Sequence, residues 1–225
     1  MLTAAVMQPY FIPYAGYYRL FAATNLFVIF DCVQFPRRGW VHRNKFSNDG
    51  KEVWLTLPIE KCPQETLIKD LHFHKDAQNL LESQLCKIDC LKKLPLIFPE
   101  LDKAIKNINK SVVDYIIDIN KLICNHLNIE FNIIKSSTLD IDPELKAQDR
   151  ILAILRALNA NHYINPPGGR DLYDANIFQQ NSIKLEFLSA YEGNFRSILE
   201  RIIMEDKNTI REEIFNNCNS LILND

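Results

Sequence analysis

Two short apolar runs near the start of the chain constrain its fold more than any other feature. They occupy residues 2–7 and 26–30, and the second contains five consecutive apolar residues. Apolar runs without alternation are typical of strands that are covered on both faces, as in parallel sheets. Between them, residues 14–23 have the length of a connecting helix. The chain therefore opens as strand, helix and strand, which is the start of an α/β unit.

The last third of the chain returns to this rhythm. Residues 131–136, 162–165 and 183–188 are predicted to be strands, with a short helix expected over 175–180. Asp142 and Pro143 predict the N-cap and the first residue of a helix that ends near residue 160. Short connections between alternating strands and helices favour right-handed crossovers. We therefore predict an α/β fold with an open, mostly parallel, Rossmann-like sheet; a nucleotidyltransferase-like layout is an alternative.

The middle of the chain interrupts this pattern. Residues 53–59 and 68–73 are predicted to be strands that pair antiparallel. Over residues 76–128 the pattern is helical, and apolar side chains recur every three or four residues in its second half. No internal repeat and no linker rich in Gly or Ser divides the sequence. We expect a single α/β domain over residues 1–225 with a helical insert at 76–128.

The charge balance and the cysteines exclude several classes of protein. The chain has 26 Lys and Arg against 28 Asp and Glu, a net charge of −2. Nucleic acid is therefore not an expected partner, because binding phosphates requires a basic surplus. We also expect no membrane span and no secretory signal, since no long apolar stretch is free of charge. The six cysteines lack the spacing of a zinc site, so we expect free thiols, no metal and a cytoplasmic location.

The first segment that could carry chemistry follows the first strand. It contains Gln8, Tyr10, Tyr14, Gly16 and Tyr17. In an open parallel sheet, ligands bind beyond the carboxyl ends of the strands. Hydroxyl donors and the beginning of a helix are suited to a phosphate or a carboxylate. We expect this segment to line a binding crevice; the alternative is that its tyrosines only pack.

The second segment follows the second strand. Asp31 ends that strand, and the basic residues Arg37, Arg38, Arg43 and Lys45 lie within nine residues. Arginine binds phosphate through two hydrogen bonds, and Trp40 offers a face for stacking a base or a sugar. His42 lies in the same loop and is the first candidate for acid–base chemistry. An anionic ligand such as a nucleotide would fit this segment, although a solvated basic loop has the same composition.

A third segment follows the predicted strand at 162–165. Asn165, Gly168, Gly169 and Tyr173 belong to it. Two glycines after a strand allow backbone N–H groups to approach an anion. The spacing matches neither a P-loop nor a dinucleotide-binding fingerprint, so a tight turn is the alternative.

These segments resemble the WbqC-like family of bacterial proteins. The resemblance rests on Met7-Gln8-Pro9-Tyr10-Phe11-x-Pro13-Tyr14-x-Gly16-Tyr17, on Asp31-x-Val33-Gln34 and on Arg38-Gly39-Trp40-x-x-Arg43-Asn44. It continues in Tyr163-Ile164-Asn165-Pro166, Gly168-Gly169 and Leu172-Tyr173. Cys32 and His42 stand where the family commonly has aspartate and asparagine. The family is associated with O-antigen and other surface-polysaccharide gene clusters, which implies work on activated sugars.

The resemblance and the residues together suggest a substrate class. We expect an enzyme that modifies a nucleotide-linked amino sugar for O-antigen biosynthesis, by acyl or aminoacyl transfer to the sugar amine. Asp31 would orient or deprotonate the amine, and Arg38 and Arg43 would hold the diphosphate. No cofactor is expected beyond the acyl or aminoacyl donor. One alternative is a non-catalytic module that binds sugar nucleotides or partner enzymes, and another is an ATP-using ligase. A homodimer, or a complex with a partner enzyme of the same pathway, would fit each of these functions.

Overall fold

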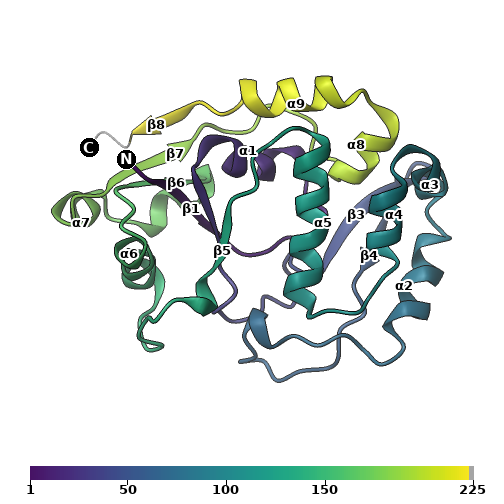
Figure 1. The fold of residues 1–225 in the computed structure, drawn as a ribbon, viewed down its shortest axis with the longest axis horizontal. Coiled ribbons are helices and arrows are strands. Elements are labelled where there is room, and N and C mark those ends of the chain that lie inside the picture. The colour runs from purple at the N-terminus through teal and green to yellow at the C-terminus, as the bar shows by residue number, and fades with distance from the viewer. Residues whose placement is uncertain (223–225) are drawn as a thin grey trace.

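The fold is organised around one sheet of parallel strands. The computed structural model describes residues 1–222. In space the strands follow the order β5-β2-β1-β6-β7, and β8 is added antiparallel at the β7 edge. Their bounds are Thr3–Met7 for β1, Leu26–Ile29 for β2, Ile133–Lys135 for β5, His162–Asn165 for β6, Lys184–Leu188 for β7 and Ser220–Ile222 for β8. The predicted open, parallel α/β sheet is confirmed (Figure 1).

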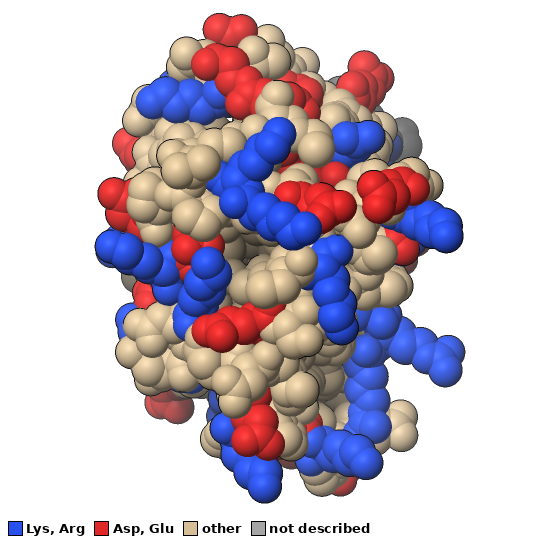
Figure 2. Space-filling model, turned by 90° about the vertical axis from the view of Figure 1, so that its right-hand side faces the viewer, with Lys and Arg blue, Asp and Glu red and all other residues tan. Residues whose placement is uncertain are grey.

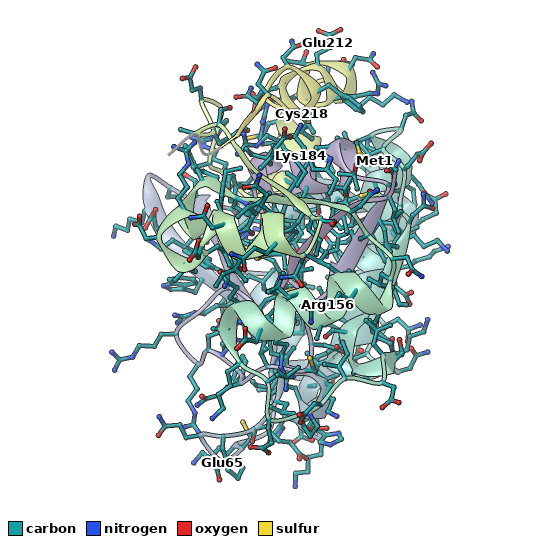
Figure 3. All side chains as sticks on the ribbon, turned by 90° about the vertical axis from the view of Figure 1, so that its left-hand side faces the viewer. Met1, Glu65, Arg156, Lys184, Glu212 and Cys218 are labelled. Carbon is teal, nitrogen blue, oxygen red and sulfur yellow. The ribbon has the colours of Figure 1, made fainter. Side chains whose placement is uncertain are left out.

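Alternate residues of the central strands pack into two different cores. Ala5 and Phe27 belong to one apolar cluster, whereas Ala4, Val6 and Val28 belong to the other. The first core is shared with helices α1 (Ala15–Ala23), α5 (Val112–His126), α8 (Ile198–Met204) and α9 (Lys207–Asn216). The second is covered by α6 (Ala147–Ala157) and α7 (Ala175–Gln180), which Figure 3 shows in front of the sheet. Burial on both faces explains why the strands lack polar alternation.

The middle of the chain differs from the expected strand pairing. β4 (Lys51–Thr56) pairs antiparallel with β3 (Arg43–Asn48) and not with residues 68–73. The cause is the two-residue turn Asp49-Gly50, where both residues have positive φ, at 49° and 73°. Such turns match the twist of a hairpin. Residues 68–70 form the 3-10 helix η1 (Ile68–Asp70), and only an isolated bridge joins Ile59 to Phe73.

A run of short helices connects the hairpin to the sheet. It contains α2 (Ala77–Leu85), the 3-10 helix η2 (Asp89–Lys93), α3 (Leu94–Ile97) and α4 (Pro99–Ile105). The last helix of this stretch, α5, packs its apolar stripe into the first core. The helix expected from Asp142 begins later, at Ala147. Asp142 instead accepts the backbone N–H of Glu144 (2.9 Å) in a turn, and the buried Arg150 binds the turn's carbonyl oxygens.

The loop between β1 and α1 is held by side chains from distant elements. Ile12 has a φ of 44°, which is rare and strained for a β-branched residue. Its carbonyl oxygen accepts hydrogen bonds from the Asn44 amide and, at 3.0 Å, from the Ser197 hydroxyl. The Tyr10 carbonyl accepts from Asn120 of α5 (3.1 Å). The loop therefore has a single conformation that β3, α5 and the start of α8 fix together.

Asn120 is the part of this arrangement that can be tested most directly. Its side-chain oxygen accepts a hydrogen bond from the buried Tyr18 hydroxyl (2.6 Å). Replacing Asn120 by Ala leaves that hydroxyl and the Tyr10 carbonyl without their partner, so we expect a loss of about 2–4 kcal/mol in the free energy of unfolding.

Urea denaturation measures this loss. Tyr18→Phe removes one bond only, and we expect it to cost about 1–2 kcal/mol. In the double variant the two losses should be less than additive because the residues share a bond. A cost below about 0.5 kcal/mol for Asn120→Ala would contradict the proposed role of this side chain.

Candidate functional site

A cavity of about 910 Å³ opens at the carboxyl ends of the parallel strands. Met7 and Gln8 at the end of β1, Pro166 after β6 and Leu188 at the end of β7 all line it. The strand order reverses direction between β1 and β6. In open α/β sheets ligands bind at this point. The connections that follow the two neighbouring strands run in opposite directions, and a crevice remains between them. The position of the cavity therefore follows from the topology.

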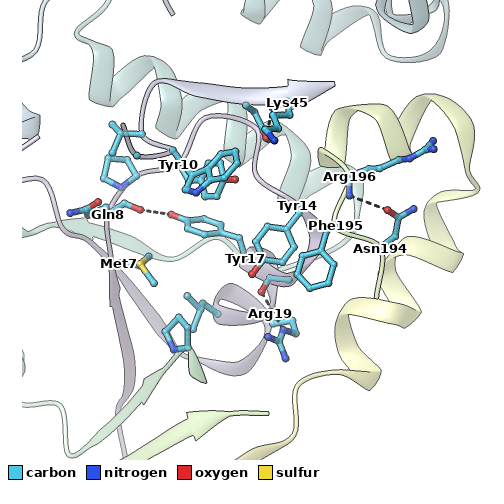
Figure 4. A pocket seen from close by; sticks show the side chains of 18 of the residues that line it. Met7, Gln8, Tyr10, Tyr14, Tyr17, Arg19, Lys45, Asn194, Phe195 and Arg196 are labelled. Atoms are coloured by element: carbon cyan, nitrogen blue, oxygen red, sulfur yellow. Dashed lines mark hydrogen bonds between the residues drawn. The ribbon is translucent and has the colours of Figure 1, made fainter. Parts of the chain in front are cut away.

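Three further segments complete the walls (Figure 4). The loop after β1 and the start of α1 contribute Tyr10, Tyr14, Gly16 and Tyr17. The second segment consists of β3 and the residues before it, and contributes Gly39, Trp40, Asn44, Lys45 and Ser47. The segment that leads into α8 contributes Asn194, Phe195 and Arg196, followed by Glu200 within that helix. The cavity is thus built from both ends of the chain.

Aromatic side chains form two groups in these walls. Tyr10 lies against Trp40 with the ring centroids 5.7 Å apart, and Trp40 lies against Trp54 at 5.5 Å. Tyr14 stacks on Phe195 at 5.2 Å, as Figure 4 shows. Trp40 is 44% exposed and Phe195 is 66% exposed. Large exposed aromatic faces at a cavity are suited to stacking on a planar ligand or a sugar ring.

The tyrosine hydroxyls act as neutral hydrogen-bonding groups. The Tyr17 hydroxyl donates to the Gln8 carbonyl at 2.9 Å. Burial raises the pKa of Tyr10, Tyr14 and Tyr17 above the ordinary value. They therefore remain protonated at neutral pH and can orient a ligand without acting as bases.

The cations of the cavity have different surroundings. Lys45 pairs with Glu52 (2.5 Å) in an exposed ion pair, which contributes little to the free energy of folding. Arg196 is exposed. Arg19 is buried and donates to three backbone carbonyls, those of Gly16 (3.2 Å), Ser189 (3.0 Å) and Asn217 (2.9 Å). Burial lowers the pKa of Arg19, and its bonds tie α1 to the C-terminal part of the chain.

Glu200 is a cavity residue that the sequence did not reveal. It is 1% exposed, and one carboxylate oxygen accepts the Ser47 backbone N–H at 3.1 Å. Burial raises its pKa, although the Ser47 bond and the Arg196 charge oppose this shift. The pattern Ser197-x-x-Glu200 is a capping-box signature, which predicts a purely local role. In the structure Ser197 does cap α8, but Glu200 reaches β3 instead.

The cavity brings together part of the predicted site. Gln8, Tyr10, Tyr14, Gly16, Tyr17, Trp40 and Asn44 line it. The other predicted residues lie outside the lining: Asp31, Gln34, Arg38, His42, Arg43, Asn165, Gly168, Gly169 and Tyr173.

Asp31 is engaged in a structural cluster. It is 1% exposed, and its carboxylate accepts hydrogen bonds from the Ser136 hydroxyl (2.9 Å) and from the backbone and hydroxyl of Ser137 (2.9 and 2.6 Å). Arg150 donates to the carbonyl of the neighbouring Cys32 at 3.0 Å. These bonds join the end of β2 to the end of β5, so the carboxylate stabilises the sheet.

The basic loop also bonds largely to itself. The Arg43 guanidinium donates to the carbonyls of Gly39 (3.1 Å) and Arg38 (2.7 Å) and lies 4.3 Å from the Trp54 ring. The Arg38 side chain is exposed, and the Gln34 amide donates to the Gln64 carbonyl (2.7 Å). Arg43 therefore shapes the loop that carries Trp40.

His42 is buried under the same loop. It packs edge-on against Phe35 at 5.0 Å, and within residues 1–222 its Nδ1 has no hydrogen-bond partner. Burial, together with the nearby charge of Arg43, lowers the pKa of His42 to about 4. It is a neutral packing residue at physiological pH.

The third predicted segment forms the 3-10 helix η4 (Pro167–Leu172). A Cβ on Gly169 would overlap the Asn165 amide, so this glycine permits a close approach within the segment. Tyr173 is half-buried, with its hydroxyl 3.4 Å from that of Tyr163. Only Pro166 of this region reaches the cavity.

Residues 1–222 offer neither a metal-binding cluster nor a membrane-spanning helix. No group of three or more His, Cys, Asp or Glu side chains in this range could hold a metal ion. None of the helices in the same range has the length and apolarity needed to cross a bilayer.

Comparison with known proteins places the chain in a family. Residues 8–199 match the family model of the WbqC-like proteins, which covers most of the cavity wall. The chain belongs to the WbqC-like protein family. It is 23% identical over 204 residues to a Mycobacterium tuberculosis protein named "Uncharacterized protein Rv1507c", covering 86% of this chain and 84% of the relative. No solved structure matches it. Glu200 of this WbqC-like protein lies just beyond the matched range.

Two glycines of the predicted site make a matched test of the packing. A Cβ on Gly16 would overlap the Tyr14 ring and lie 2.9 Å from Cγ of Tyr191, whereas nothing lies within 4 Å of a Cβ on Gly168. We expect Gly16→Ala to lower the free energy of unfolding by about 1–3 kcal/mol through overpacking. Gly168→Ala should stay within about 0.5 kcal/mol of the wild type. Denaturant unfolding of both variants checks this, and equal effects would contradict it.

Burial of His42 predicts a pH dependence of stability. Its folded pKa of about 4 lies below the unfolded value of 6.5, so the unfolded chain binds more protons between these pH values. Stability should therefore fall as the pH falls through this window. Between pH 7 and 4.5 we expect the wild type to lose about 2 kcal/mol more than His42→Asn does. Equal losses, measured by urea denaturation at both pH values, would show that His42 does not titrate in this way.

Proposed function

We propose that this protein is an enzyme that modifies a nucleotide-activated amino sugar in bacterial surface-polysaccharide (O-antigen) biosynthesis. The reaction is acyl or aminoacyl transfer to the sugar amine. The observation that carries the proposal is the aromatic-walled cavity at the point where the strand order reverses. Membership of the WbqC-like family, which is associated with polysaccharide gene clusters, supports the sugar substrate.

The dimensions and walls of the cavity support a ligand of this kind. Its volume of about 910 Å³ lies near the upper end of small-molecule sites, as a two-part ligand requires. Trp40 and Phe195 would stack on the base and the sugar, and Lys45 and Arg196 would face the diphosphate.

Figure 2 shows acidic and basic side chains interspersed on the face with α2, α3 and α4, unlike the continuous basic patch that nucleic acid requires.

The chemistry needs an amine, an activated acyl group and a place for one proton. The amine nitrogen would form a bond to the acyl carbon. The bond between that carbon and the leaving group would break, and its electron pair would go to the leaving group. The proton lost by the nitrogen would pass to the leaving group or to a base in the cavity. Asp31 is outside this proposal, because its carboxylate is enclosed by Ser136 and Ser137.

The proposal is tested by offering the protein UDP- and dTDP-linked amino sugars. Calorimetry should detect binding, and with an acyl thioester or aminoacyl donor the sugar nucleotide should gain the mass of the acyl group. Tight binding without product for any donor would favour the non-catalytic module. Release of AMP or pyrophosphate from ATP would favour the ligase. Absence of binding to every sugar nucleotide would overturn the proposal.

Trp40 provides the sharpest mutational test. Stacking of a base on an aromatic ring contributes about 1–3 kcal/mol, so we expect Trp40→Ala to weaken binding of a sugar nucleotide by this amount. Phe215 is also an exposed aromatic residue, at 38%, but lies outside the cavity lining. Phe215→Ala is therefore the control, with unchanged affinity. Calorimetry that finds both variants equal to the wild type would remove Trp40 from the site.

A further inference from the structure

Glu200 has an environment that its structural role does not explain. One oxygen accepts the Ser47 backbone N–H, which fixes α8 to β3. A glutamine could accept the same bond through its amide oxygen and would carry no charge into the interior. Burial of a carboxylate is costly unless a cation or several donors compensate it. The second oxygen, and the charge, are thus additional to what the fold requires.

No cation around the cavity forms an ion pair with this carboxylate, and the charge of Arg196 opposes the rise in its pKa only in part. Lys45 pairs with Glu52, and Arg19 donates to backbone carbonyls. Arg201, the next residue in α8, pairs with Glu205 and Glu213. Arg196 is exposed and its guanidinium lies 3.8 Å from the Met204 sulfur. Within residues 1–222 no cation forms a salt bridge with Glu200, and no group donates to its second oxygen.

We propose that Glu200 forms a subsite for the primary amine of the ligand. The amine would enter as an ammonium ion and donate to the unpaired oxygen, so that its charge compensates the buried carboxylate. A hydroxyl would supply a hydrogen bond but no compensating charge. A lone carboxylate is also a poor cation site, since Mg²⁺ and Ca²⁺ take six or more oxygen ligands and Zn²⁺ takes about four ligands.

The same contact prepares the amine for reaction. Transfer of one proton from the ammonium nitrogen to the Glu200 oxygen converts the ion pair into a neutral amine and a carboxylic acid, with no net change in charge. Burial favours the neutral pair, and the direction of the shift in the Glu200 pKa agrees with this. The nitrogen lone pair is then free to attack an acyl carbon. The identity of the sugar that carries the amine rests on the proposed function. The contact between an amine and Glu200 does not.

A pair of simple probes tests the subsite without any nucleotide. Benzylamine and benzyl alcohol have the same aromatic ring and differ in the ammonium group. With ¹³C-labelled glutamate, NMR titration should show benzylamine shifting the Glu200 carboxyl signal and binding at least about tenfold more tightly than the alcohol, as expected for a charge-assisted bond. Equal affinity, or a carboxyl signal that does not move, would overturn the inference.

Two variants show whether Glu200 causes the preference. Glu200→Gln keeps an oxygen for the Ser47 N–H, so it should fold, which its circular dichroism spectrum checks. We expect the preference for the amine to fall to less than about twofold in this variant. Glu192→Gln removes the same charge from an exposed residue outside the lining and should keep the preference. A preference retained by Glu200→Gln would overturn the inference, and the carboxyl signal of the wild type tests it even if the variant does not fold.

Sugar nucleotides then separate this inference from the proposed function. UDP-glucosamine and UDP-glucose differ only in an amine or a hydroxyl at one carbon. If both bind equally and the fragments show no preference, the amine subsite is wrong while sugar-nucleotide binding stands. If benzylamine is preferred but no sugar nucleotide binds, the subsite stands and the proposed function fails.

Discussion

The strained backbone of Ile12 is the constraint on which the site depends. A β-branched residue at a φ of 44° costs on the order of 1–3 kcal/mol and persists only when its surroundings enforce it. Here Asn44 of β3 and Ser197 at the start of α8 bind the Ile12 carbonyl, and Asn120 of α5 binds that of Tyr10. One short loop thereby connects three elements far apart in the sequence. The same loop carries Tyr10 and Tyr14 into the cavity.

This arrangement separates the polar groups of the molecule into two kinds. Asp31, Arg43 and Arg150 form hydrogen bonds within the protein and hold neighbouring segments together. The cavity retains neutral tyrosine hydroxyls, exposed aromatic faces and a buried carboxylate at Glu200. The charged side chains of Arg19, Lys45, Glu52 and Arg196 also line it. Large apolar surfaces with a small number of polar groups are the usual composition of a small-molecule site.

The sheet could be predicted because its strands are short apolar runs that need cover on both faces. The first wall of the cavity could be predicted from its place after β1. The sequence does not show which strand ends lie where the strand order reverses. Asp31, at the end of β2, was therefore as good a candidate for the site as the residues that follow β1. Its partners Ser136 and Ser137 are more than a hundred residues away and carry no local signal. Glu200 was missed for the opposite reason: the local pattern Ser197-x-x-Glu200 matches a capping box, which accounts for this glutamate without any distant partner.

The bonds of Arg19 have a consequence for how the protein is made. They reach backbone carbonyls 170 and 198 residues further along the chain, beside the segment that supplies Phe195 and Glu200. Until those residues leave the ribosome, the buried guanidinium lacks two of its acceptors and one wall of the hollow is missing. Because synthesis proceeds from the N-terminus, Arg19 of α1 cannot complete its hydrogen bonds until Asn217 has been synthesised. The cavity wall that contains Phe195 and Glu200 therefore forms only after these residues have been synthesised.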